Sequence, residues 1–134
     1  MQPVPAEYLD LLDSEVLTLA TISQTGRPQL SVVWFLAEEG TVHISVNSTR
    51  QKALNLLKNP ACSVLIIDPA SPYRYLEIRG TATVEEDKDR SFAQKVGAKY
   101  KADLSAYDEP GATRLVITVP NERVIARDLR QPSA

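Results

Sequence analysis

Short apolar segments rich in β-branched residues restrict this chain to a mainly β fold. The first, residues 16–23, reads Val-Leu-Thr-Leu-Ala-Thr-Ile-Ser and precedes a turn in which Gly26 is free to adopt a positive φ angle. Segments of the same kind recur along the chain, at 16–23, 29–37, 41–46, 61–67, 73–84, 115–119 and 124–127. Because tight turns join the first three, the pattern predicts an antiparallel meander that continues into a closed, Greek-key-like barrel of six or seven strands.

Short helices are expected beside the sheet, at 6–13, 48–58 and 87–101. Ser48 and Gln51 match a capping box at the start of the second helix, and Pro60 follows its end. We therefore expect an α+β chain, mainly β with short helices. Its elements are predicted to form one domain over 1–134, with a frayed tail at 131–134.

Charge and cysteine content narrow the classes of protein to which the chain can belong. Fifteen basic residues against seventeen acidic ones give a net charge of −2, which argues against a nucleic-acid partner. Cys62 is the single cysteine, so no internal disulfide can form and a reducing compartment fits. The first residues lack the basic start and apolar run of a signal peptide, and no apolar stretch approaches the ~20 residues of a membrane span. We expect a cytoplasmic protein without membrane contact.

The segment that says most about function is the start of the central helix, Asn47-Ser48-Thr49-Arg50-Gln51-Lys52-Ala53. A helix N-terminus presents free N–H groups and the positive end of the helix dipole, so Arg50 and Lys52 are electrostatically unfavourable there. A bound anion would reverse that penalty, because backbone donors, two hydroxyl groups and two cations would converge on one phosphate. The alternative is a plain capped helix whose basic side chains point into water.

The strand that begins at Gln29 is apolar on both of its faces. Alternation puts Leu30, Val32 and Trp34 on one face, and the other face carries Gln29, Ser31, Val33 and Phe35. One face is expected to line the barrel interior. Core packing explains that face, whereas the other favours a planar ligand or a partner subunit.

Two tyrosines, Tyr73 and Tyr75, share one face of a later strand, a pattern typical of a ligand site or a subunit boundary. The alternative is a cross-strand ladder with an exposed ion pair between Glu77 and Arg79. His43 is the single histidine and is interpreted as an ordinary strand residue, so no metal site is predicted. Hydrolytic and nucleotide-loop motifs are absent from the sequence, and no catalytic residue stands out.

Several motifs together resemble the split-barrel flavin-binding proteins related to pyridoxamine 5′-phosphate oxidase. The early ones are Leu19-Ala20-Thr21-Ile22, Gly26-Arg27-Pro28-Gln29 and Val33-Trp34-Phe35. The segment Arg50-Gln51-Lys52-Ala53, followed by Asn55-Leu56 and Asn59-Pro60, is similar to the family's phosphate-binding helix. The run from Tyr73 to Ala82 resembles the branch that uses the deazaflavin coenzyme F420. The resemblance covers nearly the whole chain and implies a split barrel of the FMN-binding type.

The same resemblance implies a homodimer with two cofactor sites at the subunit interface. Arg50 and Lys52 would hold the cofactor phosphate, assisted by neighbours that include Asn47, Ser48, Thr49, Gln51 and Ala53. The strand from Gln29 to Trp34, with Ser31 and Val33, would line the ring system. Tyr73 and Tyr75, from the other subunit, would border the ring or the substrate.

The resemblance further implies an oxidoreductase in which reduced coenzyme F420 delivers a hydride to a small organic substrate. Because the cofactor carries the redox chemistry, the protein mainly fixes distance and shields the ring. One alternative is the same fold binding FMN, as an oxidase or reductase. Another is a non-catalytic cofactor carrier, or a dimeric barrel without a ligand. The chain ends soon after Arg130 without the arginine-bearing extension of true pyridoxamine phosphate oxidases, and a single histidine does not fit the haem-handling branch.

Overall fold

The computed structural model of the chain describes residues 1–106 and 108–131. Within these residues the helices are η1 (Ala6–Asp13, a 3₁₀ helix), α1 (Gln51–Lys58) and α2 (Ser91–Tyr100). The strands are β1 (Leu17–Ile22), β2 (Pro28–Val33), β3 (Leu36–Glu38), β4 (Thr41–Asn47), β5 (Ala61–Ile67), β6 (Arg74–Thr81), β7 (Thr83–Glu86), β8 (Arg114–Val119) and β9 (Arg123–Asp128). The mainly β, antiparallel fold with short helices is therefore confirmed. Most of the predicted tail at 131–134 lies outside the described residues.

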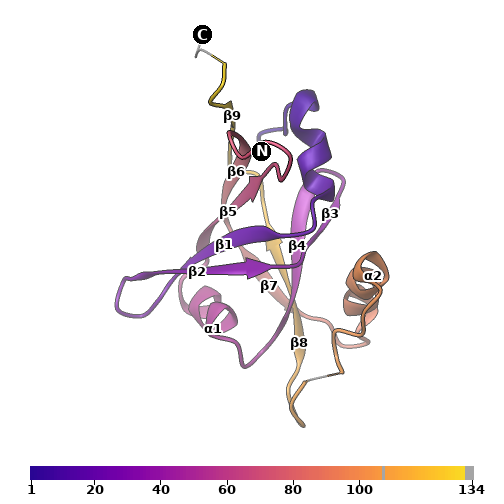
Figure 1. Cartoon of the computed structure of the whole chain (residues 1–134). Helices are drawn as coiled ribbons and strands as arrows, with labels where there is room; N and C mark the ends of the chain where they lie inside the picture. The colour runs from indigo at the N-terminus through magenta and orange to yellow at the C-terminus, as the bar shows by residue number, and fades with distance from the viewer. Residues whose placement is uncertain (107, 132–134) are drawn as a thin grey trace.

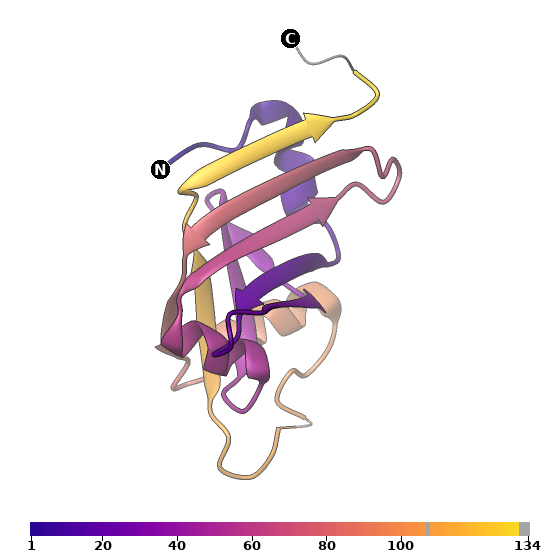
Figure 2. The same cartoon turned by 90° about the vertical axis from the view of Figure 1, so that its left-hand side faces the viewer.

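The strands form two antiparallel sheets, in the orders β2-β1-β5-β6-β9 and β3-β4-β8-β7. Figure 2 shows the strands of the five-stranded sheet side by side, with β9 at the top and β2 at the bottom. In Figure 1, α1 lies near the ends of β1 and β2, and α2 lies beside the four-stranded sheet, on the side away from α1. The two sheets together make the split barrel.

Two predicted strands are each divided in the structure, which raises the count to nine within the described residues. The segment 29–37 breaks at Trp34 and Phe35, where the chain passes from the five-stranded sheet to the four-stranded one. The segment 73–84 breaks at Ala82 in the same way. The pairing order of the predicted meander is correct, since β1 pairs with β2 and β3 pairs with β4, but the two pairs lie in different sheets and do not form one continuous meander.

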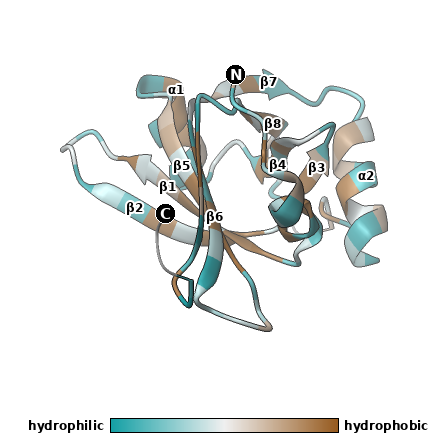
Figure 3. Ribbon diagram, turned by 90° about the horizontal axis from the view of Figure 1, so that it is seen from above, coloured by the Kyte–Doolittle hydropathy of each residue, from teal (hydrophilic) through white to brown (hydrophobic). Residues whose placement is uncertain are grey.

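The core fills the space between the sheets. Every second residue of β1 is buried, and β4 and β5 show the same alternation. Fully buried side chains come from both sheets and from the crossing at Phe35; they include Leu19, Phe35, Val42, Val64, Ile66, Leu76, Ile78, Ile117 and Val119. Figure 3 shows hydrophobic residues concentrated on the central strands, whereas α1 and α2 carry hydrophilic residues on part of their surfaces.

Two glycines fit backbone conditions that other residues would not. Gly26 has a φ angle of 83° in the turn between β1 and β2, as the sequence predicted. Gly80 lies within β6, where a Cβ would overlap the carbonyl oxygen of Pro120. The crossing from β6 to β7 therefore lies directly against the crossing from β8 to β9. A hydrogen bond of 2.9 Å from the Thr81 hydroxyl to Glu122 joins the same two crossings.

Among the described residues, no helix is long and apolar enough to cross a membrane.

Candidate functional site

A cavity of about 360 Å³ lies where the two sheets meet the start of α1. Both sheets contribute to its walls, β2 from one side and β4 and β8 from the other. The lining residues are Val33, Trp34, Ile44, Ser45, Val46, Asn47, Arg50, Lys52, Leu104 and Arg114. Residues from two separately predicted segments, 29–35 and 47–53, therefore border one space. The predicted residues found there are Val33, Trp34, Asn47, Arg50 and Lys52.

The turn before α1 differs from the predicted capping box. The helix begins at Gln51, its N-cap is Arg50, and no side chain caps it. The Ser48 hydroxyl instead accepts a hydrogen bond of 3.1 Å from the backbone N–H of Thr113. Gln51 donates to Asn55 rather than back to the turn. The first N–H groups of α1, which have no partner inside the helix, are thus left without a side-chain acceptor.

Asn47 shapes the turn in place of Ser48. Its Oδ1 accepts hydrogen bonds of 2.9 Å from both the backbone N–H and the hydroxyl of Thr49. Its Nδ2 donates to Asp108 at 2.9 Å, which fixes the orientation of the amide. The turn is therefore held from outside the helix, by the segment that precedes β8.

Arg50 and Lys52 place two cations at the positive end of the helix dipole. Neither forms an ion pair within the described residues. Partial burial lowers the pKa of the Lys52 ammonium, and the charge of Arg50 lowers it further. The start of α1 thus carries two positive charges that no acidic side chain in the described part of the chain balances. This is the electrostatic condition for binding an anion.

Arg114 also lines the cavity, although it was not among the predicted site residues. Its guanidinium donates to both carboxylate oxygens of Asp108, at 2.8 Å and 2.7 Å, and to the carbonyl oxygen of Leu104. The bidentate contact with Arg114 holds the pKa of the Asp108 carboxyl below its usual range, and the bond from Asn47 acts in the same direction. The charge of Arg114 is therefore largely balanced, unlike the charges of Arg50 and Lys52. In the sequence, Arg114 is marked only as a charged residue directly before the apolar segment 115–119, which does not indicate a site.

Other predicted site residues lie away from the cavity in this chain. Gln29 accepts hydrogen bonds from the side chains of Thr21 and Asn55, and Ala53 is fully buried in the core. Ser31 is half-buried on β2. Tyr75 lines a separate cavity of about 500 Å³ on the outer face of the five-stranded sheet, together with Leu30, Leu65, Ile67 and others. Tyr73 is 56% exposed just before β6.

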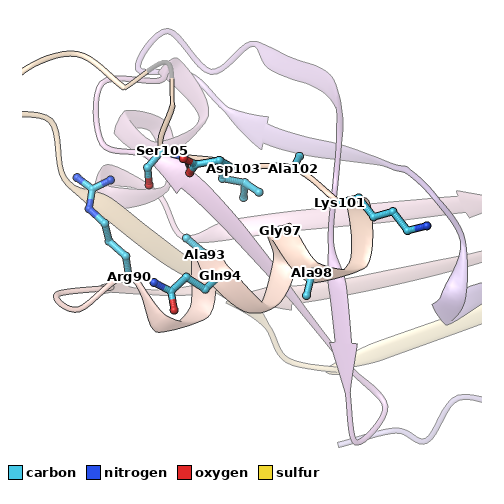
Figure 4. Close-up of a pocket in the computed structure, with 10 residues that line it drawn as sticks. Arg90, Ala93, Gln94, Gly97, Ala98, Lys101, Ala102, Asp103 and Ser105 are labelled. Carbon is cyan, nitrogen blue, oxygen red and sulfur yellow. Dashed lines mark hydrogen bonds between the residues drawn. The ribbon is translucent and has the colours of Figure 1, made fainter.

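A larger cavity of about 650 Å³ is lined by α2 and the loop after it, but none of the predicted site residues line it. Figure 4 shows Arg90 and Lys101 at opposite ends of this cavity, with their charged groups pointing apart. Two cations arranged in this way do not converge on one group. Leu104 lines both this cavity and the smaller one, so the two spaces adjoin.

The family comparisons agree with the architecture. The family model described as pyridoxamine 5′-phosphate oxidase matches residues 4–127. A solved structure named F420 reductase is 32% identical over 91% of this chain and 98% of its own, with a TM-score of 0.80. A conserved hypothetical protein from Mycobacterium tuberculosis is 24% identical over 100% of this chain and 92% of its own, with a TM-score of 0.77.

Likeness of fold extends further than likeness of sequence. The haem storage protein of Vibrio cholerae has a TM-score of 0.73 over 94% of this chain and 96% of its own, at 18% identity. At that identity the similarity shows the fold alone. No curated protein sequence shows significant similarity to the chain. With a family model that spans the two sheets and the cavity between them, the chain belongs to the pyridoxamine 5′-phosphate oxidase family.

Proposed function

We propose that this protein is an oxidoreductase that binds coenzyme F420 in the 360 Å³ cavity and uses it to transfer a hydride to a small organic substrate. The observation that carries the proposal is the convergence of Arg50 and Lys52, both without an acidic partner in the described part of the chain, on the cavity that Val33 and Trp34 also line. The similarity to the structure named F420 reductase supports this choice of cofactor over FMN.

The donor set of the cavity fits such a cofactor. Arg50, Lys52 and the free N–H groups at the start of α1 would hold the phosphate, and Val33 and Trp34 would border the ring. When bound, the deazaflavin supplies the hydride chemistry. The residues of this chain fix the position of the ring and keep water from one side of it. No residue is assigned a proton-transfer role.

We also propose that the protein works as a homodimer through the outer face of the five-stranded sheet. Leu30 and Val32 project from that face and are each 68% exposed. Neighbouring apolar side chains line the 500 Å³ cavity that contains Tyr75. Exposed apolar surface of this extent is typical of an interaction site. A second copy seated there would cover it and bring Tyr73 and Tyr75 to the subunit boundary.

The dimer is tested by sedimentation of the wild type and of a Leu30→Glu/Val32→Glu double variant. We expect a dimer for the wild type and a monomer for the variant, because two carboxylates would be desolvated in the interface. A monomeric wild type contradicts the proposal.

The cofactor site is tested by titrating coenzyme F420 and FMN against the wild type, Lys52→Ala and a matched control, Lys58→Ala. Lys58 is exposed in the last turn of the same helix, so its removal changes the net charge equally. Loss of one charge-assisted hydrogen bond is worth about 1.5–3 kcal/mol, so Lys52→Ala should weaken binding by roughly 10- to 100-fold. Lys58→Ala should bind as the wild type does.

Activity is followed as reoxidation of reduced coenzyme F420 by electrophilic acceptors. Absence of binding for both cofactors at micromolar concentration would contradict the site. Binding of FMN alone would favour the alternative of an FMN-dependent oxidase or reductase. Binding of F420 without turnover of any acceptor would favour a cofactor carrier.

A further inference from the structure

The aromatic wall of the cavity is supported from outside by α2. The rings of Trp34 and Tyr100 are stacked, with centroids 4.2 Å apart and planes inclined by 2°. Trp34 lies at the crossing between the two sheets, where no strand pairing holds the chain. The orientation of its indole is therefore set by what packs against it.

Tyr100 is itself fixed by hydrogen bonds to the backbone. Its hydroxyl accepts from the N–H of Phe35 at 3.1 Å and donates to the carbonyl oxygen of Glu15 at 2.6 Å. The preceding residue, Lys99, donates to the carbonyl oxygens of Phe35 at 2.8 Å and Ser14 at 2.9 Å. The end of α2 thus binds both backbone groups of Phe35, the neighbour of Trp34.

Trp34 borders the cavity, and Tyr100 covers one face of its indole. Trp34 lines the cavity and is 41% exposed, whereas Tyr100 is absent from the lining. Because Tyr100 is stacked on one face and does not line the cavity, we assign the opposite face of the indole to the cavity side. A flat aromatic surface remains exposed in the space that Arg50 and Lys52 also border. Such a surface favours a planar conjugated ring in offset stacking.

We infer that Tyr100 is a positioning residue: it holds the indole of Trp34 so that its open face stacks on the planar ring of the bound cofactor. This inference rests on the proposed cofactor site, because it assumes that the ring enters the cavity whose phosphate end is formed by Arg50 and Lys52. It assigns to α2, which contributes no residue to the lining, a role in ring recognition. The phosphate and the ring are then held by separate parts of the chain.

The experiment compares coenzyme F420 with its phosphate-free deazaflavin fragment, and FMN with riboflavin, by polarisation of the ligand fluorescence. Tyr100→Leu removes the stacked ring, whereas Tyr100→Phe keeps it and removes only the hydroxyl. Stacking of this kind is worth about a tenfold change in affinity. We expect Tyr100→Leu to lower the affinity for both members of the bound pair by that factor. Tyr100→Phe should retain most of the wild-type affinity. Lys52→Ala should lower the affinity only for the phosphate-bearing member.

Phe92→Leu is the matched control, since Phe92 lies on the same helix, contacts His43 and is absent from the cavity lining. Because Trp34 is the single tryptophan, its emission also reports on the stack. We expect the emission of the free protein to change in Tyr100→Leu and to stay unchanged in Phe92→Leu. Thermal denaturation establishes that each variant is folded.

The outcomes separate the two proposals. If neither ligand pair binds the wild type, the cofactor site itself is refuted. If a pair binds and Tyr100→Leu binds it as tightly as the wild type, only the positioning role is refuted. Should Tyr100→Leu fail to fold, Trp34→Leu replaces it, because that side chain is partly exposed and Tyr100 keeps its own hydrogen bonds. Unchanged affinity of Trp34→Leu for the phosphate-free ligand overturns the inference.

Discussion

Replacing Asn55 by alanine should destabilise the protein more than any other polar substitution in α1. The Asn55 side chain is buried, with 2% of the residue exposed, and lies between the helix and the hairpin of β1 and β2. Its Nδ2 donates to the Thr21 hydroxyl and to Gln29, each at 3.0 Å, and its Oδ1 accepts from Gln51 at 2.7 Å. This network fixes the helix that carries Lys52 against the strand that leads to Val33.

The expected loss follows from the number of buried bonds. Each hydrogen bond contributes about 1 kcal/mol net, and the two bonds to Thr21 and Gln29 have no replacement in the core. Gln51 is exposed and can turn to water, so its bond adds little. With the small cavity left by the amide, Asn55→Ala should lower the free energy of unfolding by about 2–3 kcal/mol. The urea midpoint should fall by roughly 1–2 M at an unchanged slope.

Equilibrium urea denaturation at one fixed protein concentration measures this loss, with Gln51→Ala as the matched control. The control removes the third bond from its exposed end and should cost under about 0.5 kcal/mol. A loss below about 1 kcal/mol for Asn55→Ala would refute the reasoning. Equal losses for the two variants would refute it as well, because the network would then not depend on burial.

Three further results are expected. Gly80→Ala should lower the stability by about 2 kcal/mol or more in thermal denaturation, because the new methyl group would overlap the Pro120 carbonyl; an unchanged melting temperature contradicts this. Arg114 lowers the pKa of Asp108, so the ionised pair stabilises the fold above the ordinary aspartate pKa of about 3.9 and the contribution disappears as the pH falls through the lowered value. Asp108→Asn should therefore show a shallower loss of stability on acidification, and an identical slope would count against the pair. Burial raises the pKa of the Cys62 thiol to about 11, so an aromatic disulfide reagent at pH 8 should react with it only after denaturation, and fast native labelling would contradict this.

Local pattern was sufficient to predict the strands but not the points where the chain changes sheet. Each predicted β segment contains at least one strand, because alternation and β-branched content are local properties. The break at Trp34–Phe35 falls inside an apolar run without a turn residue, and the break at Ala82 lies between two threonines, in a segment that alternates like a continuous strand. At the first break, burial of Phe35 and its bonds to α2 fix the geometry, and those partners lie about 65 residues away in the sequence. The residues of the segment 29–37 alone therefore do not show where the chain changes sheet.

The candidate site divides in the same way. The charges of Arg50 and Lys52 were readable from the sequence, because their sign is wrong for the start of a helix. The predicted capping box is wrong because the Ser48 hydroxyl accepts a hydrogen bond from Thr113, a residue distant in the sequence. Asp108 lies between the helix predicted at 87–101 and the strand predicted at 115–119, and only the structure brings it and Arg114 to Asn47. The sequence thus indicated the two uncompensated charges, Arg50 and Lys52, but not the side chains that orient the turn.

The contact between Gly80 and Pro120 has a consequence for how a ligand enters. This contact holds the β6–β7 crossing against the β8–β9 crossing at one seam. The hydrogen bond between Thr81 and Glu122 joins the same two crossings. Since one wall of the cavity belongs to each sheet, a seam that resists sliding keeps the walls at a constant separation. The width of the cavity is then set when the chain folds, and we expect that the cofactor proposed above would bind without one sheet closing over the other.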